Sequence, residues 1–149
     1  MIYALGVPHV NPPSEDLKRL LVEAKTIAMV GASSNPDKPS HEIMKRLLAA
    51  GYRVIPINPR ETEVLAQKAY PSLDAIPEPV DIVDVFRRGE DTPPIADEAA
   101  KIGAKALWLQ IGVSNEEAAE RAKAAGLVVV MNKCIGATHL ALGVPRRVS

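Results

Sequence analysis

The sequence predicts an α/β domain of three layers around a five-stranded parallel sheet, with the strands in the order 3-2-1-4-5. Two observations lead to this prediction. Short apolar runs alternate along the chain with segments whose apolar residues recur at helical spacing. The apolar runs are continuous and do not alternate with polar residues, which is typical of parallel strands covered on both faces.

Two helices and two strands are expected in the first half of the chain, after an irregular, proline-rich segment at 1–13. Ser40 stands where the second helix begins and Gly51 where it ends, as capping residues do. The expected elements are a helix at 14–25, a strand at 26–31, a helix at 40–51 and a strand at 52–58.

The second half continues the alternation after a long connection at 59–79 that carries several prolines and a short helix near 71–76. All of residues 14–149 are expected to form a single domain. The expected elements are strands at 81–86, 105–112 and 127–132, helices at 93–103 and 114–126, and a short mixed tail at 133–149.

The composition excludes several classes of function. Lys+Arg and Asp+Glu balance at 18 each, so net charge gives no reason to expect nucleic acid or an anionic membrane as partner. Aromatic residues make up only 3%, which argues against a stacking surface for single strands. No apolar run reaches the length of a membrane span. The single cysteine and the absence of a signal-peptide pattern predict a cytoplasmic protein.

The stretch "IAMVGASSNPDKPSHE" at 27–42 has the layout of a phosphate-binding turn between a strand and a helix. An apolar run ends at Gly31, a small polar loop follows, and a helix begins. In a parallel sheet, ligands bind beyond the carboxyl ends of the strands. The basic residues that follow the predicted strands indicate a small, phosphorylated anion as ligand. They are Lys38, Arg60, Arg87, Arg88 and Lys133.

A classical dinucleotide site is not indicated. Its glycine-rich turn needs three glycines where this loop has only Gly31, and an acidic residue should follow the second strand where Asn58 stands. Arg60 keeps one alternative open, since an arginine there suits the extra phosphate of NADP. That alternative is an NADP-binding protein or a small oxidoreductase that uses the same cleft.

Four stretches together resemble the CoA-binding-domain proteins, small relatives of the N-terminal CoA-binding domain of the succinyl-CoA ligase alpha subunit. The resemblance extends over 14–142 and implies a Rossmann-like fold that takes CoA in extended form across the strand ends. The stretches are "VGASSNPDKPSHEIMKRLLAAGYRVIPINP" at 30–59, "EPVDIVDVFRR" at 78–88, "KALWLQIGV" at 105–113 and "GLVVVMNKCIGATHL" at 126–140.

The resemblance also implies which residues meet the ligand. The turn at Gly31 would approach it with its backbone, Lys38 would face a phosphate and Asn58 the adenosine. The stretch "NKC" at 132–134 departs mildly from the "DRC" or "NRC" of relatives. The predicted cofactor-binding set is Gly31, Ala32, Ser33, Asn35, Lys38, Ser40, Asn58, Pro59, Arg60, Val85, Phe86, Arg87, Gln110, Gly112, Asn132 and Cys134.

We therefore expect a non-catalytic protein that binds CoA or acyl-CoA. The histidine that the ligases phosphorylate lies in a second domain, which has no counterpart in this sequence. An enzyme using Cys134 and His139, which have the C-x4-H spacing of some relatives, is the other class; no complete catalytic set supports it. No metal site is expected, since the histidines and the cysteine lack ligand spacing. A homo-oligomer and a complex with an unidentified protein both stay open.

Overall fold

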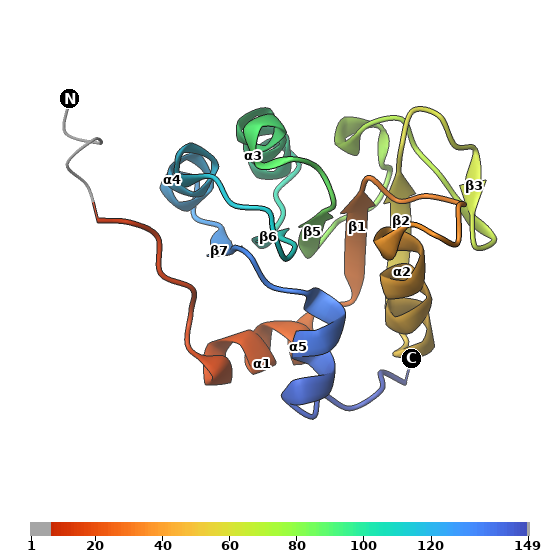
Figure 1. Cartoon of the computed structure of the whole chain (residues 1–149), viewed down its shortest axis with the longest axis horizontal. Coiled ribbons are helices and arrows are strands. Elements are labelled where there is room, and N and C mark those ends of the chain that lie inside the picture. The colour runs from red at the N-terminus through yellow and green to blue at the C-terminus, as the bar shows by residue number, and fades with distance from the viewer. Residues whose placement is uncertain (1–6, 149) are drawn as a thin grey trace.

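The computed structural model describes residues 7–148, so the first part of the predicted irregular segment 1–13 lies outside it. Five parallel strands form the main sheet of this region, as Figure 1 shows. Each strand is short, mainly apolar and largely buried, as the continuous apolar runs predict. The strands are β1 (Thr26–Val30), β2 (Arg53–Ile57), β5 (Ile82–Val85), β6 (Ala106–Leu109) and β7 (Val128–Val130).

The sheet order is β2-β1-β5-β6-β7. It matches the predicted 3-2-1-4-5 pattern when Tyr70, and not β5, is counted at the third position. Tyr70 makes a parallel bridge to Ile57 on the outer side of β2, so this single residue takes the third position. Strand β5, the third of the five predicted strands, lies in the centre between β1 and β6. The connection from β2 is long enough to place Tyr70 at the edge before it crosses back to β5.

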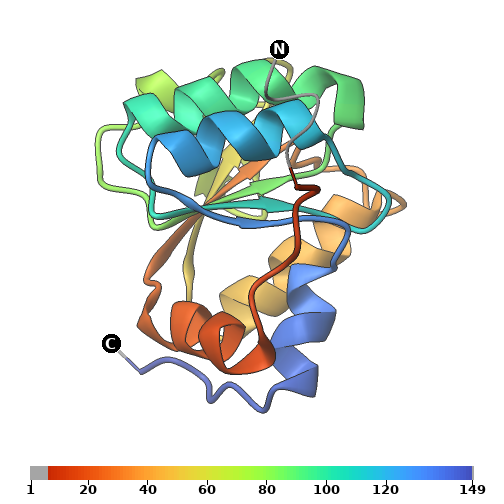
Figure 2. The same cartoon turned by 90° about the vertical axis from the view of Figure 1, so that its left-hand side faces the viewer.

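Helices cover both faces of the sheet and complete the predicted three layers (Figure 2). Alternate strand residues point to opposite faces, so Ile27 and Met29 join one core and Ala28 and Val30 the other. The core of Ile27 lies under α1 (Ser14–Glu23), α2 (Pro39–Ala49) and α5 (Ile135–Ala141). The core of Ala28 lies under α3 (Thr92–Lys101) and α4 (Glu116–Ala124).

Three features differ from the sequence-based expectation. The tail expected at 133–149 contains helix α5, which packs against α2. The connection at 59–79 contains a small antiparallel hairpin, β3 (Glu63–Val64) and β4 (Gln67–Lys68). Its expected short helix is a single 3-10 turn, η2 (Leu73–Ala75), and a second such turn, η3 (Gly89–Asp91), precedes α3. Short elements of this kind have too few residues to show a period.

The N-terminal segment crosses the open edge of the sheet beside β7. The side-chain amide of Asn11 bonds both backbone groups of Met131: its Nδ2 donates to the carbonyl oxygen and its Oδ1 accepts from the N–H, each at 2.8 Å. One side chain therefore satisfies backbone groups that an edge strand would leave unpaired. Within residues 7–148, no helix is long and apolar enough to cross a membrane.

Candidate functional site

A cavity of about 740 Å³ opens at the carboxyl ends of β1, β5 and β6, where the predicted site residues converge. Its walls come from the turn after β1, the first turns of α2, the loops after β5 and β6, and the start of α5. Ten predicted residues line it: Gly31, Ser33, Lys38, Ser40, Asn58, Phe86, Arg87, Gln110, Gly112 and Cys134.

The turn after β1 needs a glycine for two independent reasons. Gly31 has a φ of +91°, which side-chain-bearing residues rarely adopt. A Cβ atom at this position would lie 2.7 Å from the carbonyl oxygen of Phe86. The chain can therefore pass close to the end of β5 and turn into the cavity only because residue 31 has no side chain.

The loop that follows Gly31 is braced from the β2 side. Asn58 Nδ2 donates to the carbonyl oxygen of Ala32 at 2.8 Å. The Glu61 carboxylate accepts both the N–H and the hydroxyl of Ser34, each at 2.8 Å. The Ser34 N–H, and after it the Ser34 hydroxyl, lower the pKa of Glu61. Asn58 thus shapes the loop as well as lining the cavity.

Helix α2 points its N-terminus at the cavity. Its N-cap is Lys38, and Pro39 begins the helix, so Ser40 is the second helical residue and not the cap that we expect from the sequence. Ser40 is only 3% exposed, lines the cavity and has no hydrogen-bond partner within residues 7–148. A buried hydroxyl and the positive end of a helix together suit an anionic ligand.

The opposite wall carries Gln110, which is also 3% exposed. Its Oε1 accepts from the N–H of Ile135 at 3.0 Å, which fixes the orientation of the amide. The Nε2 donor therefore faces the cavity, and it has no partner among the described residues. Cys134 lies next to Ile135 and is partly exposed to the same space.

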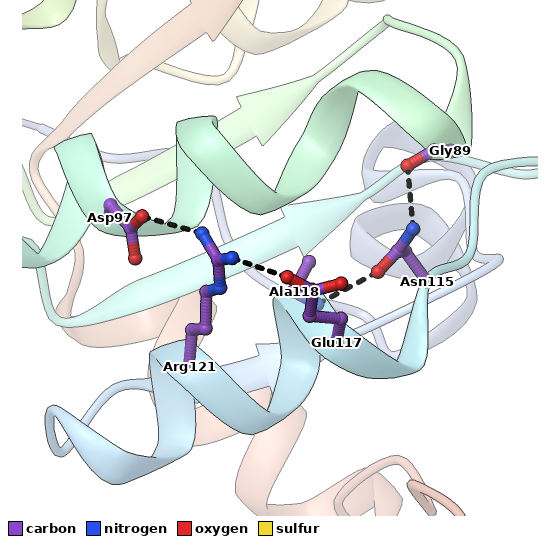
Figure 3. A network of polar contacts seen from close by, with 6 residues as sticks. All are labelled: Gly89, Asp97, Asn115, Glu117, Ala118 and Arg121. Atoms are coloured by element: carbon purple, nitrogen blue, oxygen red, sulfur yellow. Dashed lines mark hydrogen bonds and ion pairs between the residues drawn. The ribbon is translucent and has the colours of Figure 1, made fainter.

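The loop after β5 brings Phe86, Arg87 and Arg88 to the rim. The loop after β6 holds it in place, as Figure 3 shows. Asn115 Nδ2 donates to the carbonyl oxygen of Gly89 at 3.0 Å, while Asn115 Oδ1 accepts from the N–H of Ala118 at 2.8 Å and caps α4.

Helices α3 and α4 are also joined directly. Arg121 donates to Asp97 at 2.7 Å and pairs with Glu117 within its own helix. Three contacts therefore hold the loops after β5 and β6 in place. They are the bond of Asn115 to the Gly89 carbonyl, the Asn115 cap of α4 and the ion pair between Arg121 and Asp97.

Two of the basic side chains at the rim are unpaired. Arg88 bonds Glu90 at 3.2 Å, so part of its charge is neutralised. Lys38 and Arg87 line the cavity and form no ion pair with any carboxylate of the described region. Glu42, the one acidic residue of the lining, pairs with Arg46 at 3.4 Å. The cavity therefore presents two free cations.

Six predicted residues lie outside the cavity lining. Ala32 and Val85 are fully buried in the cores on the two faces of the sheet, Ala32 in the core of Ile27 and Val85 in the core of Ala28. Asn132 accepts from the N–H of Gly112 at 2.7 Å and shapes the loop after β6. The remaining three are in the exposed loops after β1 and β2: Asn35, Pro59 and Arg60.

Two further residues that the sequence singles out, the basic Lys133 and the histidine of the C-x4-H spacing, His139, lie away from the cavity. Lys133 lines a separate, smaller cavity of about 340 Å³ together with His9 and Asn11. His139 packs edge-on against Tyr52, with ring centroids 5.7 Å apart, and its buried Nε2 has no described partner. Burial lowers the pKa of His139.

The structure also adds lining residues that the sequence-based set lacks. Helical spacing carries a signal for one of them, since Ile43 is three residues from Ser40 and faces the same way. The others depend on how the loops fold and have no comparable signal. The added residues are Pro39, Glu42, Ile43, Arg88, Ile111 and Val113.

Comparison with known proteins matches residues 25–140 to the family model described as a CoA binding domain. The chain belongs to the CoA-binding domain family. It is 43% identical over 129 residues to the uncharacterized protein YneT of Bacillus subtilis, covering 87% of this chain and 96% of that one. A hypothetical protein of Pyrococcus horikoshii OT3 has the same fold, with a TM-score of 0.87, 39% identity, and coverage of 92% and 96%.

The domain also resembles part of much longer ligases. It is 33% identical over 101 residues to the ADP-forming acetate–CoA ligase II of Archaeoglobus fulgidus, which is 66% of this chain but 15% of the ligase. The acetyl-coenzyme A synthetase 1 of Ca. Korarchaeum cryptofilum, solved with phosphate and ADP, gives a TM-score of 0.70 at 31% identity. Its match covers 78% of this chain and 27% of that one. These matches confirm the resemblance and the Rossmann-like fold.

Proposed function

We propose that this protein binds CoA or acyl-CoA in the cavity at the strand ends and does so without catalysing a reaction. The observation that carries the proposal is a pair of nearly buried polar residues in the cavity walls, Ser40 and Gln110, whose hydroxyl and amide nitrogen have no partner in the described protein. Neither atom is among the fully buried, unpaired side-chain atoms of the described region, so both are open to the cavity and available to bond a ligand.

The charges favour a phosphorylated ligand, whose phosphates would lie at the α2 side. Lys38 at the start of α2 and Arg87 after β5 are unpaired, and the N-terminus of α2 adds its dipole. Apolar side chains line the same cavity, among them Phe86, Ile111 and Val113. A cavity lined by free cations and by apolar side chains suits a molecule that carries both phosphates and an organic arm.

The same geometry argues against the alternative of an NADP site. Arg60, the residue that would hold the additional phosphate of NADP, lies in an exposed loop outside the cavity. A catalytic role is also disfavoured. No hydrogen bond joins Cys134 to His139 in residues 7–148, and His139 packs against Tyr52 instead. No group of three metal-ligating side chains lies together in that region. We place this binding function in the cytoplasm, where a lone cysteine stays reduced.

Calorimetric titration with CoA, dephospho-CoA, NADPH and NADH tests the proposal. We expect micromolar affinity for CoA, on the order of −8 kcal/mol, and weaker binding of dephospho-CoA. Lys38→Ala should raise the Kd about tenfold, because it removes a charged donor to phosphate. Lys18→Ala, on the exposed face of α1 and away from the cavity, is the matched control and should bind like the unmodified protein. Binding of NADPH with no binding of CoA would overturn the proposal in favour of the alternative.

A further inference from the structure

Cys134 is the only cysteine of the chain, and its sulfur is held at a defined place in the cavity wall. Its Sγ accepts from the N–H of Ala137 at 3.5 Å. Its carbonyl oxygen accepts from Thr138, from Oγ1 at 2.8 Å and from the N–H at 2.9 Å. These contacts tie Cys134 to the first turn of α5, and the residue is partly exposed to the cavity.

A second observation at the same place points to a ligand. Gln110 contacts Ile135, the residue directly after Cys134, so its side chain lies beside the cysteine. Gln110 is only 3% exposed, and its Nε2 faces the cavity without a partner among the described residues. A ligand that satisfies this donor must place a hydrogen-bond acceptor in the same cavity that Cys134 lines.

The surroundings of Cys134 suit thiol exchange better than nucleophilic catalysis at a carbonyl carbon. A catalytic cysteine needs a positioned base. The histidine with the expected spacing, His139, faces Tyr52 and keeps its buried Nε2 away from the cavity. Thiol–disulfide exchange needs no such base, since it requires only a thiolate and access to a disulfide sulfur.

We propose that Cys134 captures the CoA thiol as a reversible mixed disulfide, an inference that rests on the proposed binding of CoA. The co-reactant is CoA disulfide. Cys134 loses its proton to solvent, and its thiolate attacks one sulfur of CoA disulfide. A bond forms between Cys134 Sγ and that sulfur while the disulfide bond of the co-reactant breaks. The second CoA leaves as a thiolate and takes up a proton, so atoms and electrons balance.

The test is the rate at which the native protein reacts with CoA disulfide and with glutathione disulfide, followed by intact-protein mass spectrometry without other oxidants. We expect one CoA adduct per chain, removed by dithiothreitol and absent in Cys134→Ser. Because the cavity positions the disulfide, CoA disulfide should react at least tenfold faster than glutathione disulfide. The preference should vanish in urea, where both reagents meet an unfolded chain. A non-reactive thioether of CoA should slow the reaction by competition.

Equal rates with both disulfides would overturn the inference, because they would make Cys134 an ordinary accessible thiol. Calorimetry with the thioether separates this failure from a failure of the proposed function. Binding of the thioether together with equal rates refutes only the capture of the thiol. Absence of thioether binding refutes the proposed function and the inference with it.

Discussion

Asp84 carries the most unusual environment in the described structure. It lies in the middle of β5, paired in register with Met29 of β1 and Trp108 of β6. It is fully buried, and neither of its carboxylate oxygens has a described hydrogen-bond partner. Burial raises the pKa of Asp84 well above its usual value. The folded protein therefore favours the protonated, neutral acid.

The sign of the pH dependence follows from this shift. Asp84 holds its proton more tightly in the folded state than in the unfolded state, so the folded state binds more protons between the two pKa values. The favourable contribution is complete below the unfolded pKa and is lost as pH rises toward the folded pKa. A difference of one bound proton changes the free energy of unfolding by about 1.4 kcal/mol per pH unit.

Asp84→Asn removes the ionisable group and keeps the shape of the side chain. The stability of the variant relative to the unmodified protein should rise with pH. Between pH 5 and pH 6 the rise should be on the order of 1 kcal/mol. Urea unfolding of both proteins at several pH values measures it. Asp97→Asn, an exposed aspartate that bonds Arg121, is the matched control and should not show this rise. An unchanged difference for Asp84→Asn across pH would refute the reasoning.

Two further predictions concern the turn after β1 and the cap of α4. Gly31→Ala should cost about 2 kcal/mol or more in urea unfolding, because it adds a positive-φ side chain and a contact of 2.7 Å with a backbone oxygen. Gly143→Ala, also at positive φ but in open space, should cost clearly less. Asn115→Ala should cost about 1 kcal/mol through the lost cap. Asn115→Asp keeps the acceptor for the cap but loses the donor to Gly89, so it should be destabilised less; an equal loss would contradict the capping role.

Much of the architecture can be predicted from the order of the residues along the chain. Continuous apolar runs separated by helical periods identify the five strands and the parallel sheet, because burial on both faces leaves no room for polar alternation. The turn at Gly31 and the basic residues after the strands indicate an anion site, because the carboxyl ends of parallel strands meet at one edge. The match to the CoA-binding domain family agrees with that prediction.

Other features depend on packing between segments far apart in the chain. Val85 and Phe86 are neighbours in sequence, yet one is sealed in the core and the other lines the cavity, because successive strand residues point to opposite faces. The central place of β5 depends on where the connection after β2 crosses the sheet. The unpaired Gln110 donor exists only because Ile135 occupies the other end of its amide. Local sequence specifies the helices and strands and the parallel direction of the strands. The contacts of each side chain depend on residues far away in the sequence, so they can be known only from the tertiary structure.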